Sequence, residues 1–261
     1  MKPKVIIVMP AYNAATTLEK TVRDIPSGFA DEIILVDDSS KDDTVRIARS
    51  LRLTVFVHEG NRGYGGTQKT CSDEALRHGA DIVIMIHPDY QYDSSLSPLF
   101  ADIIEKGVCD IILGSRVRTR KECLESGMPL YKYLSNRLLT IVENLVTGQN
   151  LSEWHTGYRA YSRKVLETIP YHQNSDDFVF DSQFLIQAAY FGFRIGDLPV
   201  PCRYMSEASS INLSRSMVYG IGTVRTIFQF VLQKLHLKRF ELFGLNDSVP
   251  ERFCGTDGRL R

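Results

Sequence analysis

Acidic and amide side chains follow two apolar runs whose length suits a buried β-strand. Residues 80–86 run into a loop that holds His87, Asp89 and Gln91, and residues 32–36 end in two aspartates. Because the ligands of open α/β sheets bind outside the carboxyl ends of the strands, both loops are expected at one edge of a sheet. A carboxylate and an amide oxygen there predict a bound metal ion, and two acidic strand ends predict an anionic substrate bridged by that metal.

The elements that position these loops form an alternating series. Strands are expected at residues 5–9, 32–36, 54–57, 81–86 and 110–113, with shorter ones at 158–161 and 194–199. Helical periodicity lies between them, and Leu18, Val22 and Ile25 are an example. This alternation predicts the α/β class, with a mostly parallel, Rossmann-like sheet and flanking helices.

The pattern changes after Gly114. A basic loop is followed by a helix expected to begin near Pro129 and to end at Gly148, since glycine often terminates a helix. We expect a catalytic domain over residues 1–212, a C-terminal amphipathic helix over 213–240 and a poorly ordered tail over 241–261. Arg225 and Lys234 interrupt the last helix, and no uncharged run reaches the roughly 18 residues of a membrane span, so peripheral membrane contact is expected.

Composition excludes several classes of function. The chain has 261 residues, 43% of them hydrophobic, which is enough for a full core. Lys and Arg together number 31, as do Asp and Glu, so no net charge attracts a nucleic acid. Five cysteines without a CxxC pair indicate free thiols in a reducing compartment. The first apolar stretch is stopped by Pro10, which makes it too short for a signal peptide. We therefore expect a cytoplasmic protein, either free or at the cytoplasmic face of the membrane.

Several short motifs occur in a recognisable order along the chain. They are Pro10-Ala11-Tyr12-Asn13, Asp37-Asp38-Ser39-Ser40, Asn61-Arg62-Gly63-Tyr64-Gly65-Gly66, Gly114-Ser115-Arg116 and Thr156-Gly157-Tyr158-Arg159. Together they resemble the family 2 glycosyltransferases with a GT-A fold. Within that family the chain is most similar to the polyprenyl-phosphate sugar transferases, the group of dolichyl-phosphate mannose synthase. The resemblance covers about residues 4–210.

The resemblance implies where a nucleoside diphosphate sugar binds. The implied substrate contacts come from the first three motifs: Pro10, Ala11, Tyr12, Asn13, Asp37, Asp38, Asn61, Arg62, Gly63 and Gly66. Paired carboxylates can accept hydrogen bonds from a base and a ribose, and glycines permit a close backbone approach. Helix capping by an aspartate and a plain glycine turn are the alternative interpretations.

The metal loop departs from the family pattern Asp-x-Asp-x-Gln. His87 takes the place of the first aspartate, and Asp89 and Gln91 match the other positions. Mg²⁺ needs only one or two carboxylates besides phosphates and waters, whereas an imidazole favours Mn²⁺ or a softer ion. Asp89 and Gln91 are therefore the expected ligands of Mg²⁺ or Mn²⁺, with His87 either a ligand or a buried neighbour. Ala14 replaces a glutamate that relatives often carry.

Further catalytic roles are implied by the later motifs. Arg116 is expected at the diphosphate or at an acceptor phosphate, Glu153 at the acceptor, and Arg159 either at the acceptor or in a buried ion pair. Asp181 is expected to orient the acceptor. Gln183 stands where relatives have a carboxylate and cannot accept a proton, which favours a phosphate acceptor that needs no base.

The resulting hypothesis is an inverting transfer of one sugar from a UDP- or GDP-sugar to a polyprenyl phosphate. Transfer to a saccharide hydroxyl is the serious alternative, and a nucleotide-sugar-binding pseudoenzyme is another, suggested by His87 and Ala14. A nucleotidyltransferase is disfavoured, because no basic glycine-rich loop follows the first strand. The sequence is also compatible with a homo-oligomer.

Overall fold

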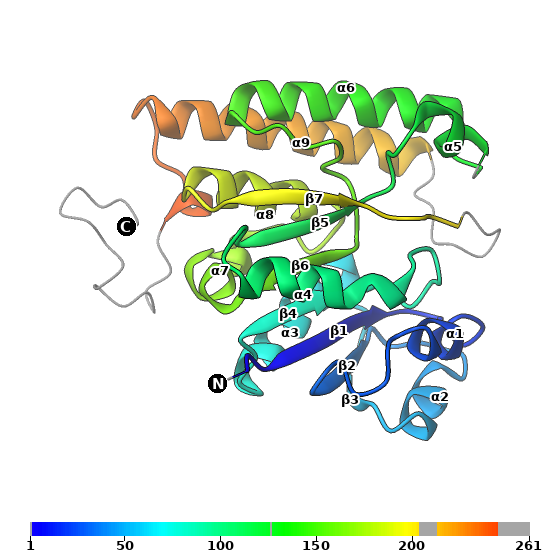
Figure 1. Ribbon diagram of the computed structural model, residues 1–261. Coiled ribbons are helices and arrows are strands. Elements are labelled where there is room, and N and C mark those ends of the chain that lie inside the picture. Colours follow the sequence, from blue (N-terminus) through cyan, green and yellow to red (C-terminus); the bar gives the residue numbers. More distant parts are fainter. Residues whose placement is uncertain (1, 126, 204–212, 245–261) are drawn as a thin grey trace.

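The computed structural model describes residues 2–125, 127–203 and 213–244. Its centre is a seven-stranded sheet in the order β3-β2-β1-β4-β6-β5-β7 (Figure 1). The strands are β1 (Val5–Ala11), β2 (Glu32–Asp37), β3 (Thr54–Val57), β4 (Ile82–Met85), β5 (Ile111–Ser115), β6 (Arg159–Ser162) and β7 (Ile195–Pro199). All seven predicted strands are present, and the predicted α/β class is confirmed.

The sheet is parallel except for β6, which runs antiparallel to both β4 and β5. Arg159 begins β6 and pairs with Met85 near the end of β4 and with Leu113 near the end of β5. The first residue of β6 therefore lies at the same edge as the carboxyl ends of the parallel strands. This places the segment before β6 beside the loop that follows β4.

Helices cover both faces of the sheet. They are α1 (Leu18–Arg23), α2 (Thr44–Ser50), α3 (Gly63–Arg77), α4 (Ser97–Glu105), α5 (Arg120–Glu125), α6 (Leu130–Thr147), α7 (Arg163–Thr168), α8 (Phe180–Tyr190) and α9 (Leu213–Lys234). Short 3₁₀ turns occur at Ser94–Leu96, Tyr171–Gln173 and Glu241–Phe243. The sequence patterns missed α4, α5 and α7, and they predict α3 only from Thr67, whereas it begins at Gly63.

Alternation along the strands divides the core into two clusters. Ile6 and Val8 of β1 face the cluster that includes residues of α3, α7 and α8. Val5, Ile7 and Met9 face the cluster that includes residues of α1, α2 and α4. Because both faces of β1 are buried, the strand is a continuous apolar run instead of an alternating one.

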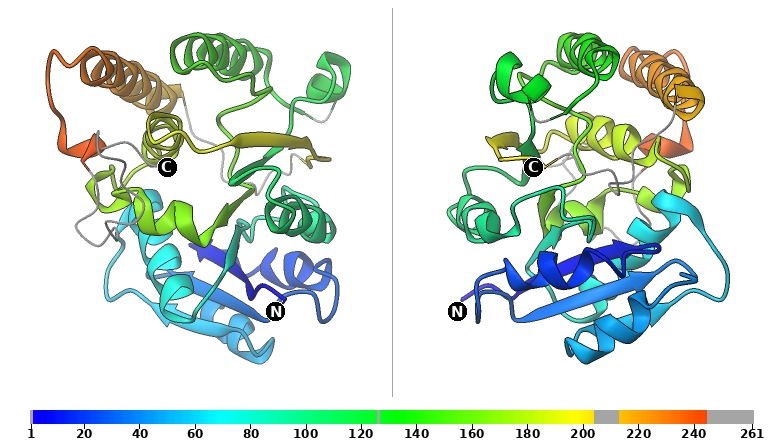
Figure 2. Two further views of the ribbon diagram at one scale, coloured as in Figure 1. Left: turned by 60° about the vertical axis from the view of Figure 1, so that its left-hand side comes forward. Right: turned by 90° about the vertical axis from the view of Figure 1, so that its right-hand side faces the viewer.

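Two long helices, α6 and α9, lie side by side at one end of the molecule, and α9 also packs on α8 (Figures 1 and 2). Gly148 follows α6 with a positive φ of 76°, as predicted for the residue that ends this helix. The predicted C-terminal helix is present as α9. Beyond it, Leu242 and Phe243 are buried in the core, so the first part of the predicted tail is packed, and residues 245–261 lie outside the described residues.

Within the described parts of the chain, none of the helices has the length and apolar character that crossing a membrane requires.

Candidate active site

A cavity of about 480 Å³ opens at the carboxyl edge of the sheet, below α6 and α9. Its polar part comes from strand-end loops and from α8, and includes His87, Asp89, Gln91, Arg116 and Asp181. Its apolar part comes mainly from the two long helices and the segment before α6: Met128, Tyr131, Leu138, Leu139 and Met217. One cavity therefore joins an ionic floor to an apolar wall.

The predicted metal loop lines this cavity. Asp89 and Gln91 follow β4, and the Asp89 carboxylate accepts a hydrogen bond of 3.1 Å from the backbone N–H of Gln91. Burial raises the pKa of Asp89, because the lost hydration of the carboxylate is not fully compensated by the neighbouring groups. No group of three or more His, Cys, Asp or Glu side chains suited to a metal occurs among the described residues. A carboxylate and an amide oxygen nevertheless fit a metal whose remaining ligands are phosphate and water.

Asp181 is held by three donors. Its Oδ2 accepts a hydrogen bond of 2.9 Å from the Tyr64 hydroxyl, and its Oδ1 accepts one of 3.1 Å from Gln68 Nε2. Arg159 Nη1 lies 3.1 Å from the same Oδ1. These contacts fix the orientation of the carboxylate on the cavity wall.

Arg159 is a structural partner of Asp181 and not an acceptor contact. Its side chain is fully buried and also donates to the carbonyl oxygens of Thr156, at 2.6 Å, and Trp154, at 3.3 Å. It does not line the cavity. The catalytic role predicted for Arg159 is therefore corrected to the alternative, a buried ion pair.

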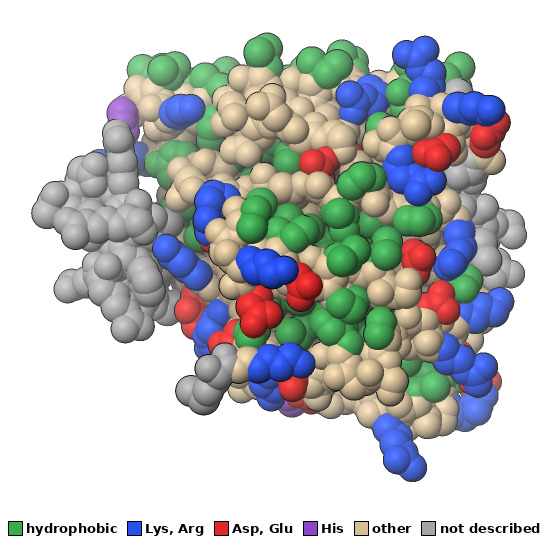
Figure 3. All heavy atoms as spheres, viewed as in Figure 1, with side chains coloured by type: hydrophobic (Ala, Val, Ile, Leu, Met, Phe, Trp, Pro, Cys, Tyr) green, Lys and Arg blue, Asp and Glu red, His purple; other side chains and the backbone are tan. Residues whose placement is uncertain are grey.

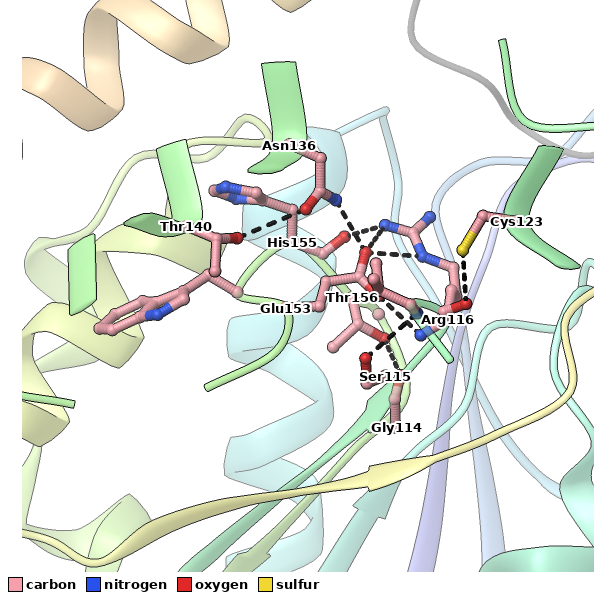
Figure 4. Close-up of polar contacts among 12 residues, drawn as sticks. Gly114, Ser115, Arg116, Cys123, Asn136, Thr140, Glu153, His155 and Thr156 are labelled. Carbon is pink, nitrogen blue, oxygen red and sulfur yellow. Dashed lines mark hydrogen bonds and ion pairs between the residues drawn. The ribbon is translucent and has the colours of Figure 1, made fainter. Parts of the chain in front are cut away.

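Arg116 is positioned by a buried glutamate (Figure 4). Glu153 accepts hydrogen bonds from the Arg116 backbone N–H at 2.7 Å and from Arg116 Nε at 2.9 Å, and Asn136 Nδ2 donates to it from α6 at 2.9 Å. Burial acts to raise the pKa of Glu153, but Arg116 holds it below the ordinary value. Glu153 is fully buried, so its predicted substrate contact is corrected to a role in fixing Arg116.

Asp37 and Asp38 have different surroundings although they are adjacent. Both are buried at the end of β2. Asp38 receives the backbone N–H groups of Arg62, at 2.7 Å, and Gly63, at 3.0 Å, together with His58 Nδ1 at 2.8 Å. It therefore caps the start of α3 and not the helix that directly follows β2. Asp37 Oδ2 accepts from Ser40 N at 2.9 Å, and its Oδ1 is buried without a hydrogen-bond partner.

The first predicted loop begins later than expected. Pro10 and Ala11 are buried residues of β1, so they are not loop contacts. Tyr12 is 52% exposed, and Asn13 Oδ1 accepts a hydrogen bond of 2.9 Å from Lys41 N in the loop after β2. Asn13 thus joins the loops after β1 and β2, and Tyr12 is the part of the motif open to a ligand.

The glycines of the third motif admit another part of the chain. A Cβ at Gly63 would lie 2.6 Å from the carbonyl oxygen of Asp176, and one at Gly65 would lie 2.3 Å from that of Ser175. Gly66 is buried beside Arg62, whose side chain is exposed, and Asn61 Nδ2 donates to the Asp38 carbonyl oxygen at 3.2 Å. The close approach predicted for a substrate is made instead by the segment that precedes α8.

We expect Gly65→Ala to lower the free energy of unfolding by about 1–3 kcal/mol, because the added methyl group overpacks the contact with Ser175. Gly220→Ala is the matched control, since a Cβ there meets nothing within 4 Å and alanine favours a helix. Urea unfolding of both variants measures the difference. A Gly65→Ala variant as stable as Gly220→Ala would contradict the packing role.

Sequence reasoning missed residues that come from helices. Tyr64 and Lys132 line the cavity from α3 and α6. His155 Nδ1 hydrogen-bonds the Tyr219 hydroxyl of α9 at 2.6 Å, and His155 Nε2 lies 3.1 Å from buried Glu143 of α6. Glu143 lies on the side of α6 opposite its apolar residues, so the sequence pattern gave no signal that it is buried. Gln183 is absent from the cavity lining, and its Oε1 accepts from Ser175 N at 2.7 Å.

Comparison with known proteins places this geometry in a family. A family model described as glycosyl transferase family 2 matches residues 6–170. The chain belongs to glycosyl transferase family 2. It is a glycosyltransferase, and the resemblance inferred from its motifs is confirmed.

Two curated archaeal relatives span most of the chain. The UDP-N-acetylglucosamine–dolichyl-phosphate N-acetylglucosaminyltransferase of Methanococcus voltae is 27% identical over 83% of this chain and 94% of its own length. The dolichyl-phosphate hexose transferase of Haloferax volcanii is 28% identical over 76% of this chain and 82% of its own.

A solved structure has the same fold. Glucosyl-3-phosphoglycerate synthase from Mycobacterium tuberculosis, in complex with Mn²⁺, UDP-glucose and phosphoglyceric acid, superposes with a TM-score of 0.67 at 19% identity. The match covers 88% of this chain and 80% of that one. The fold of the present glycosyltransferase is thus of the GT-A type.

Proposed function

We propose that this glycosyltransferase moves one sugar from a nucleoside diphosphate sugar to a polyprenyl phosphate, with inversion at the anomeric carbon. One observation carries the proposal: a single cavity joins the ionic loop of Asp89 to an apolar wall formed by α6 and α9. An acceptor with a charged head and a hydrocarbon chain matches both parts. The dolichyl-phosphate substrates in the names of the archaeal relatives support the same class of acceptor.

The acceptor phosphate has two cationic partners in the cavity. Arg116 lies beside the strand-end loops, and Lys132 lies one turn into α6. Burial, followed by the nearby Arg116, lowers the pKa of Lys132, which indicates that the two cations share one region and would gain from an anion between them. The hydrocarbon chain would then follow Tyr131, Leu139 and Met217.

A phosphate acceptor also suits the state of Asp181. A saccharide hydroxyl would need a base, but this carboxylate already accepts from Tyr64 and Gln68 and faces Arg159. A phosphate monoester has a second pKa near 6 and is mostly ionised at neutral pH, so it needs no base. Gln183 lies outside the cavity, so the contacts of Asp181, and not the Gln183 amide, favour a phosphate acceptor.

The donor would bind across the neighbouring strand ends. Asp37 Oδ1, which has no hydrogen-bond partner within the protein, would accept a hydrogen bond from the nucleoside, and Tyr12, which follows the strand partner of Asp37, offers an exposed ring. Asp89 and Gln91 would hold a Mg²⁺ or Mn²⁺ ion, which when bound neutralises charge on the diphosphate.

The reaction follows from these positions. An oxygen of the acceptor phosphate forms a bond to the anomeric carbon while the bond from that carbon to the diphosphate breaks, so the configuration inverts. Negative charge develops on the leaving diphosphate, and Arg116 stabilises charge at this end of the cavity. Asp181, fixed by Tyr64 and Gln68, orients the reacting groups without taking a proton.

Photoaffinity labelling tests the acceptor assignment without relying on turnover. A polyprenyl phosphate that carries a photoreactive group in its first isoprene units should label residues of α6 and α9 that line the cavity, such as Tyr131 and Met217. Excess polyprenyl phosphate should prevent the labelling, and neutral polyprenol of the same length should not. Labelling elsewhere, or equal competition by polyprenol, would contradict a phosphate-specific site.

The same two helices offer a surface for peripheral membrane contact. Their outward side chains are largely apolar, and hydrophobic atoms lie along the upper rim of the molecule in Figure 3. Residues of these helices that are more than half exposed include Leu130, Leu134, Leu138, Ile141, Leu145, Met217, Val218, Ile221 and Phe228. The α9 helix contains basic residues and neither Asp nor Glu, which suits an anionic surface.

We expect the wild-type protein to sediment with anionic vesicles at low salt. The double variant Leu138→Glu/Ile221→Glu should bind at least about tenfold more weakly. Burial of each apolar side chain in the membrane contributes about 1–2 kcal/mol to the free energy of binding, and the variant loses this contribution at both positions. Val108→Glu changes an equally exposed apolar residue outside these helices and should bind normally. Absence of wild-type binding, or equal binding by the double variant, would contradict the membrane surface.

A further inference from the structure

Tyr64 forms a bridge between the metal loop and Asp181. Its hydroxyl donates to Asp181 Oδ2 at 2.9 Å and lies 3.2 Å from His87 Nε2. The Tyr64 and His87 rings are stacked, with centroids 5.2 Å apart and planes inclined by 9°. One hydroxyl therefore contacts a carboxylate and an imidazole at the same time.

Hydrogen-bond donors in this bridge can be assigned. The Tyr64 hydroxyl donates its single proton to Asp181 Oδ2, and Gln68 Nε2 donates to the other oxygen of the same carboxylate. The Tyr64 oxygen can then serve His87 only as an acceptor. The contact between the Tyr64 oxygen and His87 Nε2 therefore requires the hydrogen on Nε2. If Tyr64 donated to His87 instead, its oxygen and Asp181 Oδ2 would lie 2.9 Å apart with no proton between them.

The other ring nitrogen of His87 is left with a lone pair. In a neutral imidazole whose Nε2 is protonated, Nδ1 is an acceptor or a metal ligand. His87 Nδ1 forms no hydrogen bond with the described residues, and it is not among their buried polar atoms that lack a partner, so it is accessible. The Cδ2 and Nε2 edge instead packs against Gly157, where a Cβ would lie 2.5 Å from Cδ2.

Asp89 is the candidate to bind the same metal ion as this nitrogen. It follows His87 by two residues in the same loop, and both side chains line the cavity. Among the neighbouring charges, Asp89 acts most strongly on the pKa of His87, and His87 acts most strongly on that of Asp89. A second carboxylate is not needed in this loop if the imidazole replaces it as a neutral donor.

We propose that His87 Nδ1, presented by the hydrogen bond between His87 Nε2 and Tyr64, supplies a nitrogen ligand beside Asp89 to the divalent ion of the donor site. This rests on the metal loop of the proposed function. Nitrogen ligands are tolerated by first-row transition ions better than by Mg²⁺, so the site prefers Mn²⁺ to Mg²⁺ more strongly than an all-oxygen site would. Tyr64 acts as a positioning residue, since it fixes which ring nitrogen is free.

Pulsed electron paramagnetic resonance of bound Mn²⁺ tests this proposal directly. The wild-type protein with Mn²⁺ and either uridine or guanosine diphosphate should show the ¹⁴N coupling of a ligated imidazole. His87→Asp should bind Mn²⁺ without that coupling, and His172→Gln, which removes an exposed histidine, should retain it. A wild-type spectrum without imidazole coupling for both nucleotides would overturn the proposal.

Metal affinities provide the second measurement. His87→Asp should lower the ratio of Mn²⁺ to Mg²⁺ affinity at least about tenfold, and Tyr64→Phe, which keeps the ring but loses the hydroxyl, should weaken Mn²⁺ binding severalfold while retaining the ¹⁴N coupling. An unchanged ratio in His87→Asp would contradict nitrogen ligation. No acceptor is present in these experiments, so a failure of polyprenyl phosphate transfer and a failure of His87 ligation are distinguished.

Discussion

Asp89→Asn is expected to reduce sugar transfer by at least about 10³-fold. A metal ion that neutralises the leaving diphosphate contributes several kcal/mol to the transition state, and about 4 kcal/mol corresponds to this factor. Asn keeps the shape of the side chain but removes its negative charge. Steady-state transfer at saturating Mn²⁺ measures the loss.

The same substitution should stabilise the metal-free protein at neutral pH. Burial raises the folded-state pKa of Asp89, so the unfolded chain releases this proton at lower pH than the folded one. The stability contributed by the protonated carboxyl is present below its unfolded pKa and is lost as the pH rises through the raised folded pKa. Asn does not titrate. At pH values above the folded-state pKa of Asp89, the melting temperature of metal-free Asp89→Asn should therefore exceed that of the wild type.

Asp93→Asn is the control for both effects. Asp93 lies in the same loop but caps the following turn through Ser95, and it does not line the cavity. Its transfer rate should stay within a few-fold of the wild type. An Asp89→Asn enzyme with near-normal transfer, or an equally damaged Asp93→Asn enzyme, would remove the metal-site assignment.

Arg159→Met is expected to lower the free energy of unfolding by about 3–5 kcal/mol. The substitution leaves Asp181 buried without its cation, and breaking a buried ion pair from one side has a cost of this size. Arg46→Met removes an arginine from an exposed pair with Asp43 and should leave stability close to that of the wild type. Chemical denaturation of the two variants measures the contrast.

The double variant Arg159→Met/Asp181→Asn separates the ion pair from packing. It should recover part of the lost stability, because the unpaired charge is gone. If Arg159 instead held the acceptor phosphate, Arg159→Met would raise the KM for the acceptor with little loss of stability. That result would restore the role predicted from the motif.

The strands could be predicted because burial on both faces leaves a simple trace in the sequence. The run that became β1 is apolar at successive positions, and Gly148 marked the end of α6 through its tolerance of a positive φ. The antiparallel direction of β6 could not be predicted in this way. A short apolar run has the same composition in either direction, and only its pairing with β4 and β5 decides.

The motifs indicated charged residues at this edge of the sheet but not the contacts that these residues make within the protein. Asp38, Glu153 and Arg159 match family motifs, yet their charged groups are occupied by the protein itself. A carboxylate that caps a helix and one that binds a nucleotide are the same residue type at the same strand end, so only their hydrogen-bond partners in the folded protein separate them. Lys132 reaches the cavity from a helix that no motif indicated, and Tyr64 lies within the third motif but was not among its expected contacts.

We propose that the acceptor is a polyprenyl phosphate, bound where the ionic floor meets the apolar wall of the cavity. The most direct measurement is transfer of labelled sugar, from UDP- and GDP-sugars with Mn²⁺, to polyprenyl phosphate and to free saccharides in parallel. We expect label in the lipid phosphate and not in the saccharides, with Asp181→Asn retaining measurable transfer because no base is required. Robust transfer to a saccharide hydroxyl that disappears in Asp181→Asn would contradict the claim.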